Sequence, residues 1–130
     1  MPERGEGVIL FPQYSNVEMH SECRAEIIQL IQKDEIPSFL ASYEQRVKFL
    51  SEHLGQEIKH KSWFEILKKT QGLRSIRFMK FRNLRILYAL ENKKAFLLAA
   101  FEERQGHRNT EYGPYIDIAQ KRLNQKGVSR

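Results

Sequence analysis

The sequence predicts an α+β domain in which helices pack on one face of a twisted antiparallel sheet and a last helix ends the chain. The first observation is a change of period. Apolar residues recur at helical spacing through the first half of the chain and then alternate with polar residues between positions 73 and 101. The second is size and composition. The 130 residues, 41% hydrophobic and 29% charged, suit one compact domain spanning 1–130.

Two helices are expected before the sheet. The first begins at Ser21, a residue type that caps helices. The second covers about 36–54, where Pro37 suits the first turn and Gly55 suits a left-handed cap. The expected core-facing residues are Cys23, Ile27, Leu30 and Ile31 in the first helix, and Ile36, Leu40, Tyr43, Val47, Leu50 and Leu54 in the second.

Three strands are expected next, at 73–79, 84–90 and 95–101. The polar links between them are short, which favours antiparallel hairpins and hence a three-stranded meander. The run at 8–11 is a candidate for an extra N-terminal strand at the edge. A last helix at about 115–125 carries Ile116, Ala119 and Leu123 at core spacing. Trp63 and Phe64 are expected to seal a helix against the sheet, and Trp63 is also a candidate partner anchor.

Positive charge is concentrated in the second half of the chain. Residues 1–71 hold 9 Lys and Arg against 11 Asp and Glu, whereas residues 72–130 hold 13 against 5. Such a bias favours a polyanionic partner such as nucleic acid, although a solvated basic face would have the same composition. No acidic residue interrupts a run of five basic ones: Arg74, Arg77, Lys80, Arg82 and Arg85.

Several classes of protein are disfavoured. The lone cysteine, Cys23, excludes an internal disulfide and a cysteine metal cluster. His20, His53 and His60 lack metal-ligand spacing, and no glycine-rich phosphate loop is present, so we expect no metal or cofactor. No apolar run approaches membrane-spanning length. These features favour a soluble, cytoplasmic protein.

Two groups of residues are candidates for chemistry. Arg77 and Arg85 would lie on neighbouring strands, where two guanidinium groups can hold one phosphate; the alternative is a pair of inert exposed arginines. After the last strand, polar and aromatic side chains crowd a short segment where a sheet presents functional groups. Histidine and tyrosine there can transfer protons, while a tyrosine can also stack on a base or simply pack the last helix. The residues of this segment are Arg104, His107, Arg108, Tyr112 and Tyr115.

Three consecutive segments carry an ordered set of motifs. Leu73-Arg-Ser-Ile-Arg77 is followed by Asn83-Leu-Arg85-Ile-Leu-Tyr88 and by an apolar strand that ends at Phe101. A basic loop and a helix with Ala119 and Arg122 come next. This order resembles the RelE/ParE superfamily of bacterial toxins, and most of all its phage-related HigB-like branch. The resemblance covers about 36–124, and residues 1–35 form an extra N-terminal segment.

The resemblance implies a toxin that cleaves messenger RNA on the ribosome and is neutralised by an antitoxin, often one with a helix-turn-helix domain. In that family the ribose 2′-OH attacks the scissile phosphate without a metal. Carried onto this sequence, the resemblance implies strand arginines at Arg77 and Arg85, a loop arginine at Arg104 or Arg108, a late aromatic residue at Tyr112 or Tyr115, an acid or base at His107, and RNA contacts from Arg74, Lys80 and Arg82.

The chain departs from the family pattern at three places. Glu102 and Glu103 stand where many relatives carry two basic residues, and Ser75 stands where some carry a catalytic lysine. The loop is also about three residues longer. The rival hypothesis is therefore a non-enzymatic inhibitor or binding module, in the manner of the ParE toxins that target DNA gyrase. A phage-derived relative that has lost cleavage is a third.

Overall fold

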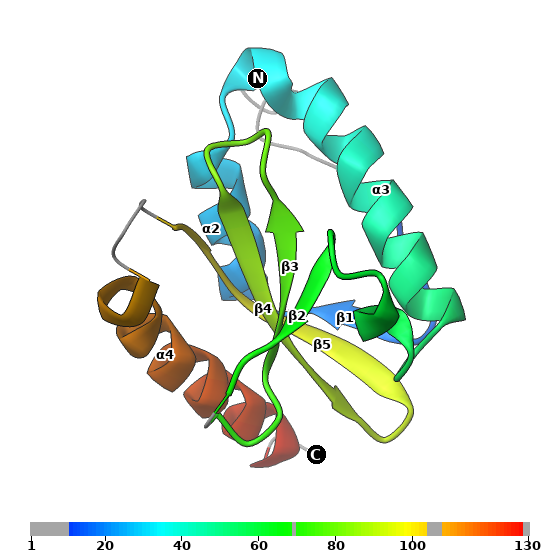
Figure 1. Cartoon of the computed structure of the whole chain (residues 1–130), viewed down its shortest axis with the longest axis vertical. Helices are drawn as coiled ribbons and strands as arrows, with labels where there is room; N and C mark the ends of the chain where they lie inside the picture. Colours follow the sequence, from blue (N-terminus) through cyan, green and yellow to red (C-terminus); the bar gives the residue numbers. More distant parts are fainter. Residues whose placement is uncertain (1–10, 69, 104–107, 129–130) are drawn as a thin grey trace.

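The computed structural model describes residues 11–68, 70–103 and 108–128 and, within the last helix, the side chains of 112–125. The elements in chain order are β1 (Val17–Met19), α2 (Ser21–Leu30), α3 (Ile36–Glu52), β2 (Phe64–Ile66), β3 (Arg74–Phe78), β4 (Leu84–Glu91), β5 (Lys94–Glu102) and α4 (Arg108–Val128), with short 3₁₀ turns at Lys33–Glu35 and Glu57–Lys59 (Figure 1). The α+β class is as predicted.

The strands form one five-stranded mixed sheet in the order β1-β5-β4-β3-β2. The three predicted strands are present as β3, β4 and β5, and they pair antiparallel in chain order. The prediction of a purely antiparallel sheet is wrong at one edge, because β1 runs parallel to β5. Parallel pairing is possible there because a long stretch of chain separates the two strands. Strand β2 was not predicted. Of the candidate edge strand 8–11, residues 8–10 lie outside the described residues.

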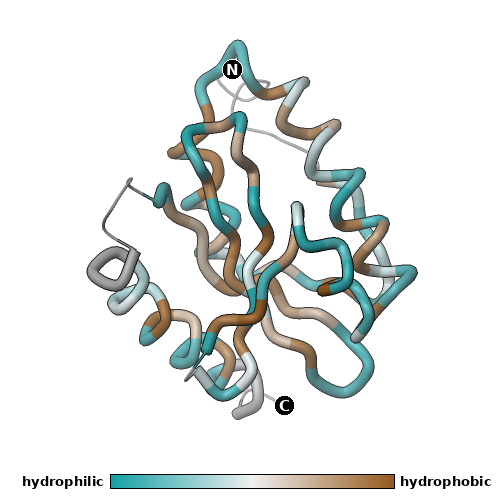
Figure 2. Tube along the Cα trace, in the orientation of Figure 1, coloured by the Kyte–Doolittle hydropathy of each residue, from teal (hydrophilic) through white to brown (hydrophobic). Residues whose placement is uncertain are grey.

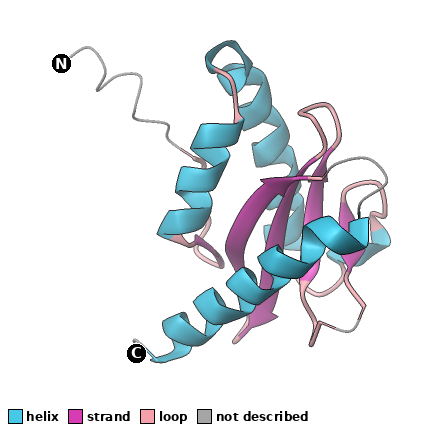
Figure 3. Ribbon diagram, turned by 90° about the vertical axis from the view of Figure 1, so that its left-hand side faces the viewer, coloured by secondary structure: helices cyan, strands magenta, loops and turns pink. Residues whose placement is uncertain are grey.

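The sheet is covered on both faces, so the prediction of helices on one face is wrong. Helices α2 and α3 bury one face, and α4 lies across the other (Figure 3). The cause lies in β4 and β5, whose residues are buried on both sides and need cover on each. The first face carries Phe39, Tyr43, Val47, Leu50, Ile76, Phe78, Ile86 and Tyr88, and the second carries Leu73, Leu87, Leu98, Phe101, Tyr112 and Ala119.

The helix ends follow the sequence signals in part. His20, not Ser21, caps α2, because its Nδ1 accepts a hydrogen bond from the backbone N–H of Glu22 at 3.0 Å. Pro37 lies in the first turn of α3, as predicted, and Gly55 adopts a φ of 89° just beyond its end. Phe39 replaces Leu40 among the fully buried residues of α3, where Leu40 is only partly buried.

Helix α4 begins at Arg108, seven residues before the predicted start at 115. The pair Gly113-Pro114 signals a loop, yet the helix continues through it. Apolar burial on both sides of Pro114 outweighs the backbone hydrogen bond that proline cannot make, since Tyr112 and Ala119 are both buried against the sheet.

Side chains protect the part of the β5 edge that lies beyond the short strand β1. The Glu26 carboxylate of α2 accepts from the backbone N–H of Ala100 at 3.0 Å. Arg122 of α4 donates to the carbonyl of Leu98 at 2.7 Å and forms an ion pair with Glu26 at 2.8 Å. Arg122, one of the residues that carry the family resemblance, therefore ties both helices to the sheet and shields its edge from further strand pairing.

Apolar residues follow the strands and the inner sides of the helices, while the turns are hydrophilic (Figure 2). In the part of the chain that the structure describes, none of the helices combines the length and the apolar character that a membrane crossing requires.

Candidate functional site

Two arginines face each other on the side of the sheet that α4 covers. Arg77 of β3 and Arg85 of β4 are direct partners in the antiparallel register, so their side chains leave the same face from adjacent strands. Like charges opposite one another destabilise a sheet unless acidic groups or a bound anion compensate them. This pair is therefore the natural centre of a site.

One carboxylate compensates each arginine. Glu65, on the edge strand β2, accepts from Arg77 Nη2 at 3.1 Å. Glu103, just after β5, pairs with Arg85 Nη2 at 2.5 Å. Across the sheet the four side chains therefore follow one another in the order Glu, Arg, Arg, Glu.

Three polar atoms on this face have no hydrogen-bond partner among the described residues, although they are buried. They are Nε of Arg77, Nη1 of Arg85 and Oγ of Ser75. Ser75 is 0% exposed and Arg85 only 7%. An unsatisfied buried donor costs free energy, and a guanidinium N–H costs more than a neutral one. An anionic acceptor such as phosphate would satisfy the two guanidinium donors, but it would reach these buried atoms only if the side chains that cover them moved.

Tyr112 completes the cluster from the second turn of α4. Its hydroxyl accepts from Arg85 Nε at 3.1 Å and donates to Glu103 Oε1 at 3.3 Å. Burial raises the pKa of Tyr112, the Arg85 guanidinium lowers it, and the Glu103 and Glu65 carboxylates raise it again. The net shift is upward, so the phenol is protonated at neutral pH, as an unperturbed tyrosine is, and is a weaker acid than an exposed one.

Tyr115 has a packing environment instead. Its ring stacks on Phe101 at 4.3 Å between centroids with the planes 7° apart, while Tyr112 meets the same ring edge-on. Of the two alternatives for the late aromatic residue, the structure brings Tyr112 to the arginines and packs Tyr115 against the core.

Three other predicted residues lie outside the described side chains. Arg104 and His107 precede α4 and fall in the undescribed segment 104–107, and Arg108 is the first residue of α4 with an undescribed side chain. Their predicted roles in proton transfer and phosphate binding stay predictions.

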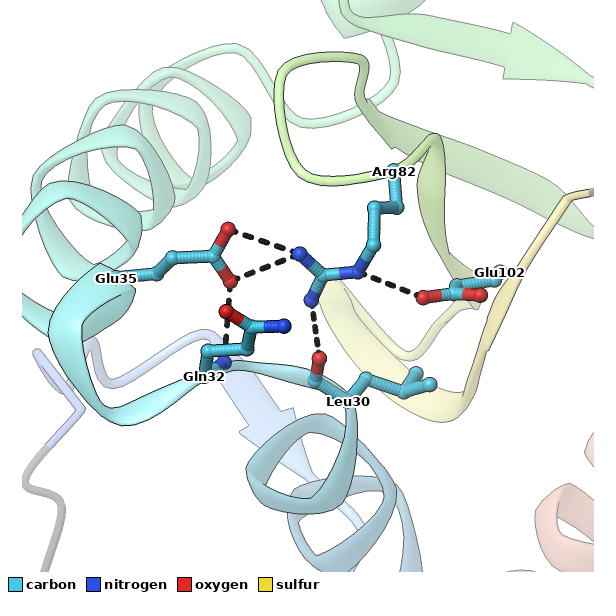
Figure 4. A network of polar contacts seen from close by, with 5 residues as sticks. All are labelled: Leu30, Gln32, Glu35, Arg82 and Glu102. Atoms are coloured by element: carbon cyan, nitrogen blue, oxygen red, sulfur yellow. Dashed lines mark hydrogen bonds and ion pairs between the residues drawn. The ribbon is translucent and has the colours of Figure 1, made fainter.

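The basic residues predicted to touch RNA are placed in different ways. Arg74 lies on the opposite face, where it forms an ion pair with the buried Glu57 at 2.6 Å. Arg82 bridges three parts of the chain. It pairs with Glu35 and Glu102, both at 2.8 Å, and donates to the Leu30 carbonyl at the end of α2 (Figure 4).

Both arginines therefore have structural partners, while Lys80 lies exposed in the turn after β3. The pKa of Glu35 is lowered chiefly by the hydrogen bond from the Arg82 guanidinium. A second hydrogen bond, from the backbone N–H of Gln32, lowers this pKa further. None of this tests RNA binding by the three residues.

Two functional candidates escaped the sequence analysis, and both are glutamates. Glu65 lies on a three-residue strand, too short for alternation to reveal. Glu103 enters the sequence analysis only as a departure from the family pattern, beside Glu102. The two diverge, Glu102 to Arg82 and Glu103 to Arg85. A signal was available only for Glu103, which lies two residues after Phe101, the register partner of Arg85.

A hollow of about 450 Å³ lies next to this cluster at the outer edge of β2. Its lining residues are Ile58, Lys61, Phe64, Glu65, Ile66 and Arg77. Arg77 and Glu65 are therefore shared between the hollow and the arginine pair. The volume falls in the range of about 300–1,000 Å³ that is typical of small-molecule pockets.

No group of three or more His, Cys, Asp or Glu side chains comes together as a candidate metal site in the described part of the chain. In comparisons with known proteins, no family model matches this chain, and no curated protein matches it.

Proposed function

We propose that this protein is the toxin of a type II toxin–antitoxin pair and acts as a ribosome-dependent endoribonuclease on messenger RNA. The observation that carries the proposal is the pair of facing arginines, Arg77 and Arg85, with buried donors that have no acceptor among the described residues. We also assign the fold to the RelE/ParE superfamily, because the chain carries an ordered set of motifs that resembles it. The same resemblance is the reason for proposing messenger RNA as the substrate.

The chemistry follows from what these side chains can do. The ribose 2′-OH attacks the adjacent phosphate and expels the 5′ oxygen, leaving a cyclic phosphate. Negative charge builds on the nonbridging oxygens, where Arg77 and Arg85 stabilise it. We assign to Tyr112, which is protonated at neutral pH and bonded to Arg85, the donation of a proton to the leaving oxygen. His107 and a loop arginine, Arg104 or Arg108, are assigned the remaining proton transfer and phosphate contact from the sequence alone.

The proposal also names partners and a place in the cell. Cleavage on the ribosome requires a cytoplasmic protein, and the basic second half of the chain suits ribosomal RNA. The cognate antitoxin is expected to carry a helix-turn-helix domain. The protein itself requires no metal or cofactor in this mechanism.

One observation favours a second candidate, the non-enzymatic inhibitor or binding module. Glu65 and Glu103 already compensate both arginines, at 3.1 and 2.5 Å, which reduces the net charge that the site offers to a phosphate. A chain that has lost cleavage would tolerate such neutral pairs, because it needs a stable surface more than an open cationic one.

Induction in a bacterial host with mapping of messenger RNA ends separates the two candidates. The chain is expected to cut within translated codons, and Arg85→Ala is expected to lower cleavage at least about 100-fold, as for loss of a main transition-state contact. Lys48→Ala removes one positive charge from an exposed position on α3 and is expected to cleave normally. Circular dichroism must show that both variants fold.

Growth arrest with intact messages would replace the nuclease proposal by the inhibitor. Absence of both effects would also contradict the nuclease and leave binding as the remaining activity.

A further inference from the structure

The hollow at the edge of β2 combines an apolar wall with a charged rim. Ile58, Phe64 and Ile66 supply the wall, and Ile66 is 45% exposed. Lys61, Glu65 and Arg77 supply the rim. An apolar wall with a few polar groups is typical of a small-molecule pocket.

The rim contains the link to the arginine pair. Arg77 lines the hollow and also faces Arg85 across β3 and β4. A ligand with its phosphate on Arg77 can therefore reach the hollow with its next group. In a nucleotide that group is the ribose with its base. Lys61 adds a second positive charge on the same rim, which suits a neighbouring phosphate of the strand.

Glu65 selects among bases. Its carboxylate holds Arg77 Nη2 through Oε1, and an ionised carboxylate has about four acceptor positions and no donor. It can accept from the exocyclic amino group of cytosine, whereas uracil presents a carbonyl oxygen at the same place and would be repelled.

We infer that the hollow formed by Ile58, Lys61, Phe64, Glu65, Ile66 and Arg77 is a nucleobase pocket that prefers bases with an exocyclic amino group. The inference rests on the proposed function for the identity of its substrate, single-stranded RNA. It adds a specificity-determining residue, Glu65, that takes no part in the cleavage chemistry.

The test is an NMR titration of the intact chain with two matched probes, 3′-CMP and 3′-UMP, which differ in the group at ring position 4. The cytosine nucleotide is expected to bind roughly fivefold to a hundredfold more tightly. Backbone amide shifts are expected at Glu65, Ile66 and Arg77.

Glu65→Gln is expected to bring the two affinities within about twofold, because an amide offers both a donor and an acceptor. Glu44→Gln, an exposed position on α3, is the matched control and should keep the preference. Ile66→Trp, which fills the hollow from an exposed position, is expected to weaken both nucleotides.

Equal binding of the two nucleotides, shifts confined to other residues, or no binding at all would each overturn the inference. Codon-internal cleavage with equal binding would retain the nuclease and reject the pocket. A cytosine preference that Glu65→Gln removes, in a chain that cleaves no message, would retain the pocket and reject the nuclease.

Discussion

The same three residue types form a cluster on each face of the sheet. Under α2 and α3, Glu57 pairs with Arg74 and Tyr88. Under α4, Glu103 pairs with Arg85 and Tyr112. In the first cluster the carboxylate is fully buried and accepts short hydrogen bonds of 2.6 Å from Arg74, 2.7 Å from Tyr88 and 2.7 Å from the Gly55 N–H. That cluster fastens the loop after α3 to the sheet.

The second cluster has one short ion pair, 2.5 Å between Arg85 and Glu103, and is otherwise less completely hydrogen-bonded. The Tyr112 contacts are 3.1 and 3.3 Å long, Arg85 Nη1 has no partner among the described residues, and a second arginine stands opposite. A closed network stabilises a fold, whereas a network with open donors keeps binding capacity for a ligand. On this contrast we base the proposal that Arg74 is structural and Arg85 functional, although the sequence presents them as equal members of one basic run.

Breaking the closed cluster should have the largest effect. Glu57→Gln removes the charge that compensates Arg74 and weakens the acceptor for Tyr88, and breaking a buried ion pair typically costs about 3–5 kcal/mol. We expect the midpoint of thermal unfolding to fall by roughly 10–20 °C. Glu52→Gln, at an exposed position at the end of α3, is the control. An unchanged midpoint for Glu57→Gln would contradict the assignment of a structural role to the cluster of Glu57, Arg74 and Tyr88.

The two tyrosines provide the next contrast. Tyr88→Phe leaves the buried Glu57 without one of its donors and should cost roughly 1–3 kcal/mol. Tyr112→Phe leaves the buried Arg85 Nε without its acceptor, but the hydrogen bonds of 3.1 and 3.3 Å that it removes are longer, so its cost should lie at the lower end of that range. The same variant should lower cleavage at least about 100-fold if the Tyr112 proton is used. Chemical denaturation and messenger-end mapping measure the two quantities. The reverse order of stabilities would contradict the assignment.

The strands were predictable because alternation and short links are local signals. They placed β3 and β4 in a hairpin, and with them Arg77 opposite Arg85. The carboxylates were not predictable in the same way. Glu57 meets Arg74 from 17 residues earlier in the chain, and a count of charges says nothing of which are paired. The ion pair of Arg82 was unpredictable for the same reason, since its partner Glu35 lies 47 residues away in the chain.

The prediction for the start of α4 was wrong for a different reason. Gly113 and Pro114 are breakers in any local reading, but the packing of Tyr112 on the sheet keeps the chain helical before them. The short strand β2 likewise depends on its pairing with β3, in which Glu65 lies opposite Ser75. Tertiary contacts determine both the start of α4 and the position of β2, and such contacts cannot be read from a single sequence.

A smaller effect is expected where an anion can replace a carboxylate. Glu103→Gln removes the charged partner of Arg85, so inorganic phosphate should stabilise this variant more than the parent chain. At ten times its dissociation constant the ligand adds about 1.4 kcal/mol, which raises the unfolding midpoint by a few degrees. Glu102→Gln is the matched control, because the adjacent carboxylate pairs with Arg82 on the other face. Equal stabilisation of both variants would indicate only the general effect of the salt.

Alkaline pH gives the smallest and most direct contrast between the two clusters. Burial, then the charge of Glu57, raises the pKa of Tyr88, whereas the raised pKa of Tyr112 is partly offset by Arg85. A phenol that keeps its proton in the folded state contributes stability in full below its unfolded pKa of about 10. That contribution is lost as the pH rises from there toward the folded pKa, by at most about 1.4 kcal/mol per pH unit for one proton. Denaturant midpoints between pH 9 and roughly pH 11 should therefore fall less steeply in Tyr88→Phe than in Tyr112→Phe, and equal slopes would place the two phenols in equivalent environments.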